Sequence, residues 1–215
     1  MANASFNFKL LSFNAWGIRD LYKQETIFTW INKQKVDIVF LHKNYSSKEI
    51  ENQFKLQRCC RMLFVHGANH SKGVLILVSE NLQIDMRNEL EDSEGRYIFV
   101  EALIEDAPFL LVNLYALTKT QEQCVFFDVV ANTLEDSSLD PNCQIIIGGD
   151  FNSQFDSSLN NLGRIKSKPS VQKINEIMAA YDLIDICRIH NPEKKQFTWT
   201  QKKTFNKTTP GLLAC

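Results

Sequence analysis

The chain has 215 residues, with 24 basic and 25 acidic side chains and a formal net charge of -1 at pH 7. This balance excludes a protein that attracts nucleic acid through a global basic field, so any polyanion must meet a local patch. Hydrophobic residues make up 44% of the chain and include 15 phenylalanines, which excludes a disordered protein. We expect one domain over residues 1–200, followed by a divergent tail over residues 201–215.

The cysteines and the N-terminal sequence indicate an intracellular setting, in the nucleus or the cytoplasm. The six cysteines form no CxxC pair, and the chain starts without the charged and apolar regions of a signal peptide. No apolar run reaches the roughly 18 residues that a transmembrane helix needs. We therefore expect no membrane partner, and we infer no obligate oligomer. His66 and His70 flank Gly67 and are interpreted as loop histidines rather than metal ligands.

Strand and helix patterns intersperse along the chain. In the first half of the chain they predict a strand over 8–14, a helix over 20–33, a strand over 36–41, a helix over 47–54, and strands over 59–66, 73–78, 97–104 and 109–114. In the second half they predict a helix over 121–134, a strand over 144–148, a helix over 170–181 and a strand over 196–200. Ser170 is the expected N-cap of the helix over 170–181. The continuous apolar runs at 74–78 and 145–147 are typical of strands covered on both faces. The pattern favours the α+β class, as a layered two-sheet sandwich with helices outside the sheets.

The stretch QIIIGGDFNS, residues 144–153, places polar side chains directly after a buried strand. The strand stops at two glycines, so the residues that follow reach the rim of a sheet. Asp150 and Asn152 are two positions apart and lie on the same side of an extended chain. The alternative interpretation is a β-turn, because glycine, aspartate and asparagine all favour turns.

Several segments resemble the endonuclease/exonuclease/phosphatase superfamily in order and spacing. IIIGGDFNS resembles the family's GDFN motif, LSFNAWG at 11–17 resembles the first-strand motif ending in an active-site asparagine, and VDIVFL at 36–41 resembles the strand that leads into LQET. The segments that resemble LINE-type members in particular are 73–78, 94–97, 112–116, 182–185 and 197–199. The chain is thus similar to the endonuclease domain of LINE-type, non-LTR retrotransposons, which is apurinic-endonuclease-like. The resemblance implies a four-layer α/β/β/α sandwich of the DNase I-like kind.

The resemblance also implies roles for individual residues. Asp150, Asn152 and Tyr115 would be catalytic, Asn14 would help to hold a Mg²⁺ or Mn²⁺ ion, and Arg96 would face the backbone of a DNA partner. Each role has a structural alternative. Asn14 can cap a strand end, Tyr115 can be a core aromatic, and Arg96 can be a solvated hairpin charge.

The chain departs from the family pattern in two places. Lys43 occupies the position of the metal-binding glutamate of LQET, and an ammonium group has no acceptor with which to ligate a cation. Near the C-terminus, no aspartate follows Asp185 and no histidine follows His190, although the family ends with an aspartate and a histidine that complete its site. We therefore expect a copy that lacks the last strands of the fold and is catalytically impaired.

Three functional interpretations stay open. The first is a metal-dependent phosphodiesterase fold that resembles a DNA-nicking retrotransposon endonuclease and is impaired in catalysis. The second is a non-catalytic module that binds DNA or phosphate, with Lys43 standing in for the metal charge. The third is a working nuclease. In the DNA-binding interpretation, lysines near the C-terminus would contact the DNA backbone, and the alternative is that they belong to a solvated tail. These residues are Lys194, Lys195, Lys202, Lys203 and Lys207.

Overall fold

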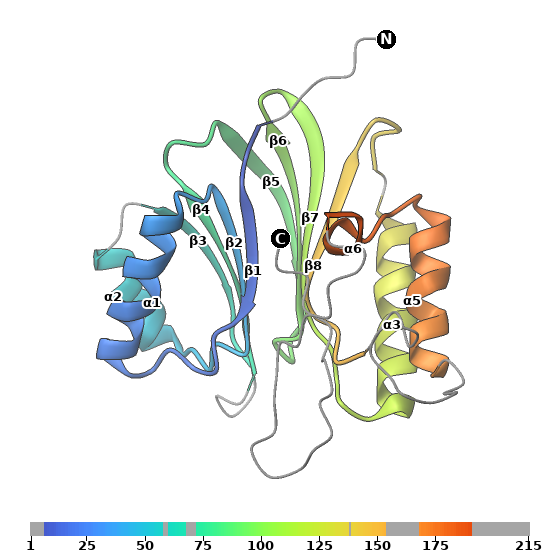
Figure 1. Cartoon of the computed structure of the whole chain (residues 1–215), viewed down its shortest axis with the longest axis horizontal. Helices are drawn as coiled ribbons and strands as arrows, with labels where there is room; N and C mark the ends of the chain where they lie inside the picture. The colour runs from blue at the N-terminus through green and yellow to red at the C-terminus, as the bar shows by residue number, and fades with distance from the viewer. Residues whose placement is uncertain (1–6, 58–59, 68–71, 138, 154–167, 191–215) are drawn as a thin grey trace. The chain divides into compact units, whose positions relative to one another are not determined.

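The computed structural model describes residues 7–57, 60–67, 72–137, 139–153 and 168–190 (Figure 1). The chain divides into two compact units, one made of residues 1–115 and 141–149 and the other of residues 116–140 and 150–215. The single domain expected over 1–200 stays a prediction. The strand expected at 196–200, the tail, the late lysines and the missing last strands lie outside the described residues.

The first unit holds two four-stranded sheets. One sheet has the order β1-β2-β4-β3 and the other the order β5-β6-β7-β8. The strands are β1 (Leu10–Asn14), β2 (Ile38–His42), β3 (Cys60–Val65), β4 (Val74–Ser79), β5 (Ile84–Glu91), β6 (Tyr97–Ile104), β7 (Ala107–Tyr115) and β8 (Gln144–Asp150). The helices of this unit are α1 (Leu21–Gln34) and α2 (Lys48–Gln57).

The first sheet is mixed, since β1 runs parallel to β2 whereas β4 is antiparallel to both β2 and β3. A parallel pair needs a crossover, and α1 supplies it. The side chain of Asp20 begins this helix by accepting a hydrogen bond from the Lys23 amide at 2.8 Å. The helix buries Phe28 and Ile31 against the outer face of the sheet, next to Leu41 and its neighbours.

The second sheet contains a tight hairpin between β6 and β7. The two connecting residues, Glu105 and Asp106, both have positive φ angles, of 50° and 65°. Positive φ at both central positions is the geometry of the type I′ turn, which suits the twist of paired strands. The strands expected at 97–104 and 109–114 are confirmed, and they pair through this hairpin.

Sequence patterns missed β5, the first strand of the second sheet. Its sequence IDMRNELE is rich in charge and largely exposed, and its register shifts between Met86 and Asn88. Charged side chains and bulges are common on edge strands because they discourage pairing with another chain. The same features remove the apolar alternation by which a strand is recognised in a sequence.

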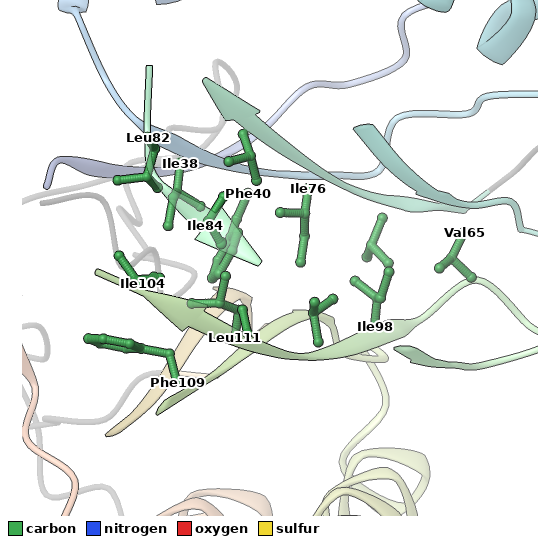
Figure 2. Packing of buried hydrophobic residues seen from close by; sticks show 14 residues of the cluster. Ile38, Phe40, Val65, Ile76, Leu82, Ile84, Ile98, Ile104, Phe109 and Leu111 are labelled. Carbon is green, nitrogen blue, oxygen red and sulfur yellow. The ribbon is translucent and has the colours of Figure 1, made fainter. Parts of the chain in front are cut away.

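The core of the first unit lies between the two sheets and confirms the expected sandwich. Figure 2 shows side chains such as Ile38, Phe40 and Ile76 from one sheet facing Ile98 and Leu111 from the other. All of these side chains are buried, and burying a large aliphatic or aromatic side chain contributes about 1.5–3 kcal/mol to folding.

One polar side chain connects the two sheets. The Asn113 amide on β7 donates to the carbonyl oxygens of Leu41 at 3.0 Å and Leu75 at 3.1 Å, on β2 and β4. Two sheets packed only by apolar groups can slide, whereas directed hydrogen bonds at a buried position fix their register. Asn113 therefore fixes the end of β7 against the ends of β2 and β4 within the first unit.

The described helices of the second unit are α3 (Thr120–Asp136), α5 (Pro169–Ala180) and α6 (Ile186–His190). Lys173 on α5 contacts Asp128 on α3 through an ion pair of 2.8 Å. The helix expected at 170–181 is confirmed, but its expected N-cap is wrong. The cap is Lys168, Pro169 is the first helical residue, and Ser170 is buried inside the first turn. Proline suits that first position because its fixed φ is helical and the amide it lacks would be unpaired there.

Among the residues that the structure describes, no helix is both long enough and apolar enough to cross a membrane.

Candidate nucleic-acid interface

The predicted site residues of the first unit lie where neighbouring strands end. Asn14, the last residue of β1, pairs in register with His42, the last residue of β2, and His42 pairs with Val74, the first residue of β4. The next residue after β2 is Lys43. Backbone bonds continue beyond the strands, since the Gly17 amide donates to the Lys43 carbonyl at 2.8 Å. The loops after β1 and β2 are therefore held side by side.

Lys43 is held between aromatic rings. Its ammonium nitrogen lies 3.8 Å from the centre of the Trp16 ring and 5.9 Å from the centre of the Tyr45 ring. Both distances fall within the range in which a cation is attracted to a π-face. We call these three residues the aromatic–lysine cluster. The interpretation of Lys43 as a cation rather than a metal ligand stays a prediction.

Asn14 stabilises the loop that carries Trp16. Its side-chain oxygen accepts a hydrogen bond from the Trp16 amide at 3.0 Å. This is the strand-end cap considered above as the alternative to a metal-binding role. The role of Asn14 at a metal stays a prediction.

Tyr115 and Arg96 contact each other in the first unit. The Arg96 guanidinium lies 5.3 Å from the centre of the Tyr115 ring and donates to the Tyr115 carbonyl at 3.3 Å. The Tyr115 amide in turn donates to the Arg96 carbonyl at 2.7 Å. The structure thus brings these two predicted residues together, with the arginine folded onto the tyrosine ring. A backbone-facing role for Arg96 stays a prediction.

A polar network fixes the loop that follows β2. The Ser46 hydroxyl lies 2.8 Å from Nδ1 of His66, and Nε2 of the same ring lies 3.0 Å from Glu51. Lys48 also donates to Glu51, at 2.9 Å. His66 lies in the loop after β3, as expected, and links this loop to α2 and to the residues before it. His70 lies outside the described residues.

Uncharged polar side chains lie buried behind these loops, at the end of the sandwich of the first unit. Ser12, His42 and Asn113 are almost fully buried and each has side-chain polar atoms without a hydrogen-bond partner among the described residues. Burial lowers the pKa of His42 from 6.5 to about 3, because a desolvated imidazolium is costly. His42 is consequently neutral at physiological pH, and Lys43 carries the positive charge at this strand end.

Asp150 and Asn152 lie together in the second unit. The Asp150 carboxylate accepts a hydrogen bond from the Asn152 amide at 3.1 Å, and the Asn152 side chain donates to the Ala116 carbonyl at 2.7 Å. Asn152 has a φ of 46°, a left-handed conformation that asparagine tolerates. Gln123 on α3 supports this turn by donating to the Asn152 carbonyl at 2.9 Å. The turn considered as the structural alternative is thus present, and the catalytic roles of both residues stay predictions.

Sequence reasoning missed the cluster around Lys43. Trp16 follows the strand-end Asn14 by two positions, and it is 58% exposed although tryptophan is usually well buried. A large aromatic residue two positions after a strand-end asparagine and directly before a glycine is the signal that could have identified it.

The position at which the resemblance expects a metal-binding carboxylate carries a cation, and metal binding stays a prediction. Magnesium and manganese prefer carboxylate oxygens, and the strand end that should supply the carboxylate carries the ammonium of Lys43. In the part of the chain that the structure describes, no group of three or more histidine, cysteine, aspartate or glutamate side chains can hold a metal ion.

Comparisons with known proteins find a protein with a similar sequence and solved structures with a similar fold. The chain is 27% identical over 188 residues to the Transposon TX1 uncharacterized 149 kDa protein of Xenopus laevis, a match that covers 87% of this chain and 14% of that protein. No protein-family model matches the chain. The chain thus corresponds to a small part of its transposon relative.

Solved structures confirm the DNase I-like sandwich. An AP endonuclease from Archaeoglobus fulgidus superposes with a TM-score of 0.71 at 17% identity, covering 93% of this chain and 80% of that one. The APE2 catalytic domain of Xenopus laevis superposes with a TM-score of 0.69 at 15% identity, covering 91% and 76%. The chain thus has the fold of these endonucleases, and its sequence is similar to a part of a transposon protein.

Proposed function

We propose that this domain binds the backbone of DNA through Lys43, the cation of the aromatic–lysine cluster, and through neighbouring cations, and that it hydrolyses phosphodiester bonds poorly or not at all. The observation that carries the proposal is the position of Lys43. Its ammonium group lies at the end of β2, against Trp16, where the resemblance expects the glutamate that binds the metal.

Elementary electrostatics supports both halves of the proposal. At ~4 Å a dication and a monocation repel each other by roughly 2 kcal/mol in bulk water, and more strongly where solvent is excluded. The same ammonium attracts a phosphate monoanion by roughly 1 kcal/mol at that distance. Replacing a carboxylate by an ammonium thus disfavours the metal and favours direct contact with the phosphate.

The alternative is metal-dependent nicking, and the turn that holds Asp150 and Asn152 favours it. In the family these residues would position the attacking water and the phosphate oxygen. The carboxylate is 7% exposed and is oriented toward the Asn152 amide, as a preorganised group would be. Another carboxylate would then have to replace the function lost at position 43.

A nicking assay separates the two functions. The purified chain is incubated with supercoiled plasmid in magnesium or manganese, with EDTA and the Asp150→Ala variant as controls. We expect no conversion to nicked circles above the controls, with folding verified by circular dichroism. Metal-dependent nicking that disappears in Asp150→Ala would overturn the proposed loss of activity.

A binding assay tests the DNA half of the proposal. Duplex affinity is measured by fluorescence anisotropy over a range of salt concentrations, for the wild type, Lys43→Gln and Lys33→Gln. Lys33 is exposed in the last turn of α1 and serves as the matched control for the loss of one charge. We expect Lys43→Gln to weaken binding about fivefold, equivalent to roughly 1 kcal/mol, and to reduce the salt slope by about one. Equal affinities of the two variants would contradict a specific role for Lys43.

A further inference from the structure

We propose that Trp16 stacks on an unpaired base of the bound DNA, next to the phosphates that the surrounding cations contact. This inference rests on the proposed function and deepens it, because it selects single-stranded or locally unpaired DNA over fully paired duplex. It concerns a side chain for which the family resemblance implies no role.

The Trp16 ring is exposed although its backbone is rigidly held. The side chain is 58% exposed, so much of its π-surface meets solvent. Its amide donates to Asn14, and its carbonyl accepts a hydrogen bond from the Lys23 ammonium at 2.7 Å. Its φ of 51° is uncommon for a bulky residue, and such conformations persist only where the surroundings enforce them. The fold therefore keeps a large aromatic ring in water at a fixed position.

Lys43 covers part of one face of this ring. The ammonium lies 3.8 Å from the ring centre, and the Lys43 backbone also has a left-handed φ, of 56°. The centre of the Tyr45 ring lies 5.9 Å from the same ammonium. The Tyr45 ring packs against Gly17, where a Cβ atom would lie 2.7 Å from the ring. A ring supported from one side by a cation presents its remaining surface as a platform.

The charges around the platform suit a nucleic-acid strand. Three cations lie on these segments. Lys43 contacts the ring, Lys23 in the first turn of α1 donates to the Trp16 carbonyl, and Arg19 donates from its Nε to the Tyr45 carbonyl at 3.1 Å. The one carboxylate in these loops belongs to Asp20, and it accepts the hydrogen bond that caps α1. An exposed aromatic ring among cations is the arrangement with which proteins bind single strands, because every base has a π-face and every nucleotide a phosphate.

Stacking on Trp16 requires a base that is not already stacked in a duplex. A paired base inside a duplex has both faces covered by its neighbours, so it offers no surface to an indole ring. A base in a single strand, a bulge or a flipped position offers one. We therefore expect discrimination between paired and unpaired DNA to come from Trp16, and affinity for phosphate to come from the three cations.

The test compares binding of a short oligo(dT) with binding of a fully paired hairpin, by anisotropy, for the wild type, Trp16→Ala, Trp16→Tyr and Trp30→Ala. Trp30 is the matched control. It is 44% exposed on α1 but packs edge-on against Phe13, and no cation–π contact to its ring is seen among the described residues. We expect Trp16→Ala to weaken oligo(dT) binding about tenfold, with hairpin binding changed less than twofold, and Trp16→Tyr to retain most of the affinity. We expect Trp30→Ala to bind both ligands as the wild type does.

Incorporation of 5-fluorotryptophan gives an independent readout that does not depend on removing the ring. The chain contains three tryptophans, whose fluorine resonances are assigned with single Trp→Phe variants. We expect oligo(dT) to shift the resonance of Trp16 and to leave that of Trp30 in place.

The outcomes separate this inference from the proposed function. Binding of both ligands that is unaffected by Trp16→Ala, or a Trp16 resonance that does not move, would overturn the stacking role and leave DNA binding intact. Failure of the folded wild type to bind either ligand would overturn the proposed function itself.

Discussion

The strand ends that carry the predicted site residues differ in how far they match the pattern that the resemblance implies. At the end of β8, Asp150 and Asn152 keep the carboxylate and the amide that the pattern expects, and side-chain hydrogen bonds hold the turn closed. At the end of β2, Lys43 replaces the expected carboxylate, yet the loop is equally well held, through backbone groups and aromatic contacts. The side-chain chemistry of a site can therefore change where main-chain contacts hold the loop, because those contacts do not depend on the side chain.

The largest effect is expected at the end of β8, where the backbone has no room for a side chain. Gly149 has a φ of 139°, and a Cβ atom there would overlap the backbone of Leu114. We expect Gly149→Ala to lower the free energy of unfolding by about 3 kcal/mol or more, since both strain and overlap must be relieved. Urea denaturation followed by circular dichroism measures the change.

Gly148→Ala is the control for this prediction. Its Cβ atom would lie 2.7 Å from the side chain of Phe40 rather than against backbone, and Gly148 has no left-handed φ. We expect a smaller loss than for Gly149→Ala. Equal losses of stability in the two variants would show that the positive φ and the backbone overlap at Gly149 do not determine the cost.

A pH-dependent effect is expected at the end of β2. The pKa of His42 is about 3 in the folded chain and near 6.5 when unfolded, so the unfolded state binds the proton more readily between these values. The contribution of His42 to stability is complete above pH 6.5 and decreases as the pH falls toward 3, by up to about 1.4 kcal/mol per pH unit. Urea denaturation at a series of pH values measures it.

His42→Leu removes the titrating imidazole and places an apolar side chain of similar size in the core. We expect the stability of the variant to decrease less steeply than that of the wild type between pH 6.5 and pH 4.5. Parallel curves for the two proteins would mean that His42 finds a partner or reaches solvent in the folded chain.

The sharpest way to test the difference between the strand ends is to restore the carboxylate. We expect Lys43→Glu to bind Mn²⁺ more tightly than the wild type, as measured by calorimetry, because repulsion becomes attraction. The same variant should bind duplex DNA about 30-fold more weakly, which corresponds to roughly 2 kcal/mol for replacing an attractive charge by a repulsive one. Unchanged Mn²⁺ affinity would indicate that position 43 alone does not decide whether the strand end accepts a metal.

The smallest effect concerns the cap of α1, which follows the loop that carries Trp16. We expect Asp20→Ala to cost about 1 kcal/mol of stability, because the Lys23 amide loses its acceptor. Asp20→Ser keeps an acceptor oxygen and should lose less. Thermal denaturation of the two variants provides the comparison, and identical midpoints would argue against the cap.

Much of the fold was predictable because its strands are apolar and its turns have characteristic residues. The bounds of β6 were predicted to the residue, and the N-terminal residue that caps α1 coincides with the start of the expected helix. β5 was not predicted because its charged sequence lacks apolar alternation. The expectation for Ser170 failed because proline at the first helical position moved the cap back to Lys168.

The site was predictable only as a set of positions. The substitution at position 43 is visible in the sequence, but the placement of its ammonium over Trp16 depends on left-handed backbone at both residues. No periodicity or motif encodes such conformations for tryptophan or lysine. The contact between Arg96 and Tyr115 likewise depends on strand register, which the hairpin turn sets in three dimensions.

The main-chain bond between Gly17 and Lys43 has an evolutionary consequence. Because the carbonyl of residue 43 holds the loop whatever its side chain, a glutamate codon can become a lysine codon by one base change without unfolding the domain. A change of charge at position 43 therefore need not lead to an unfolded product.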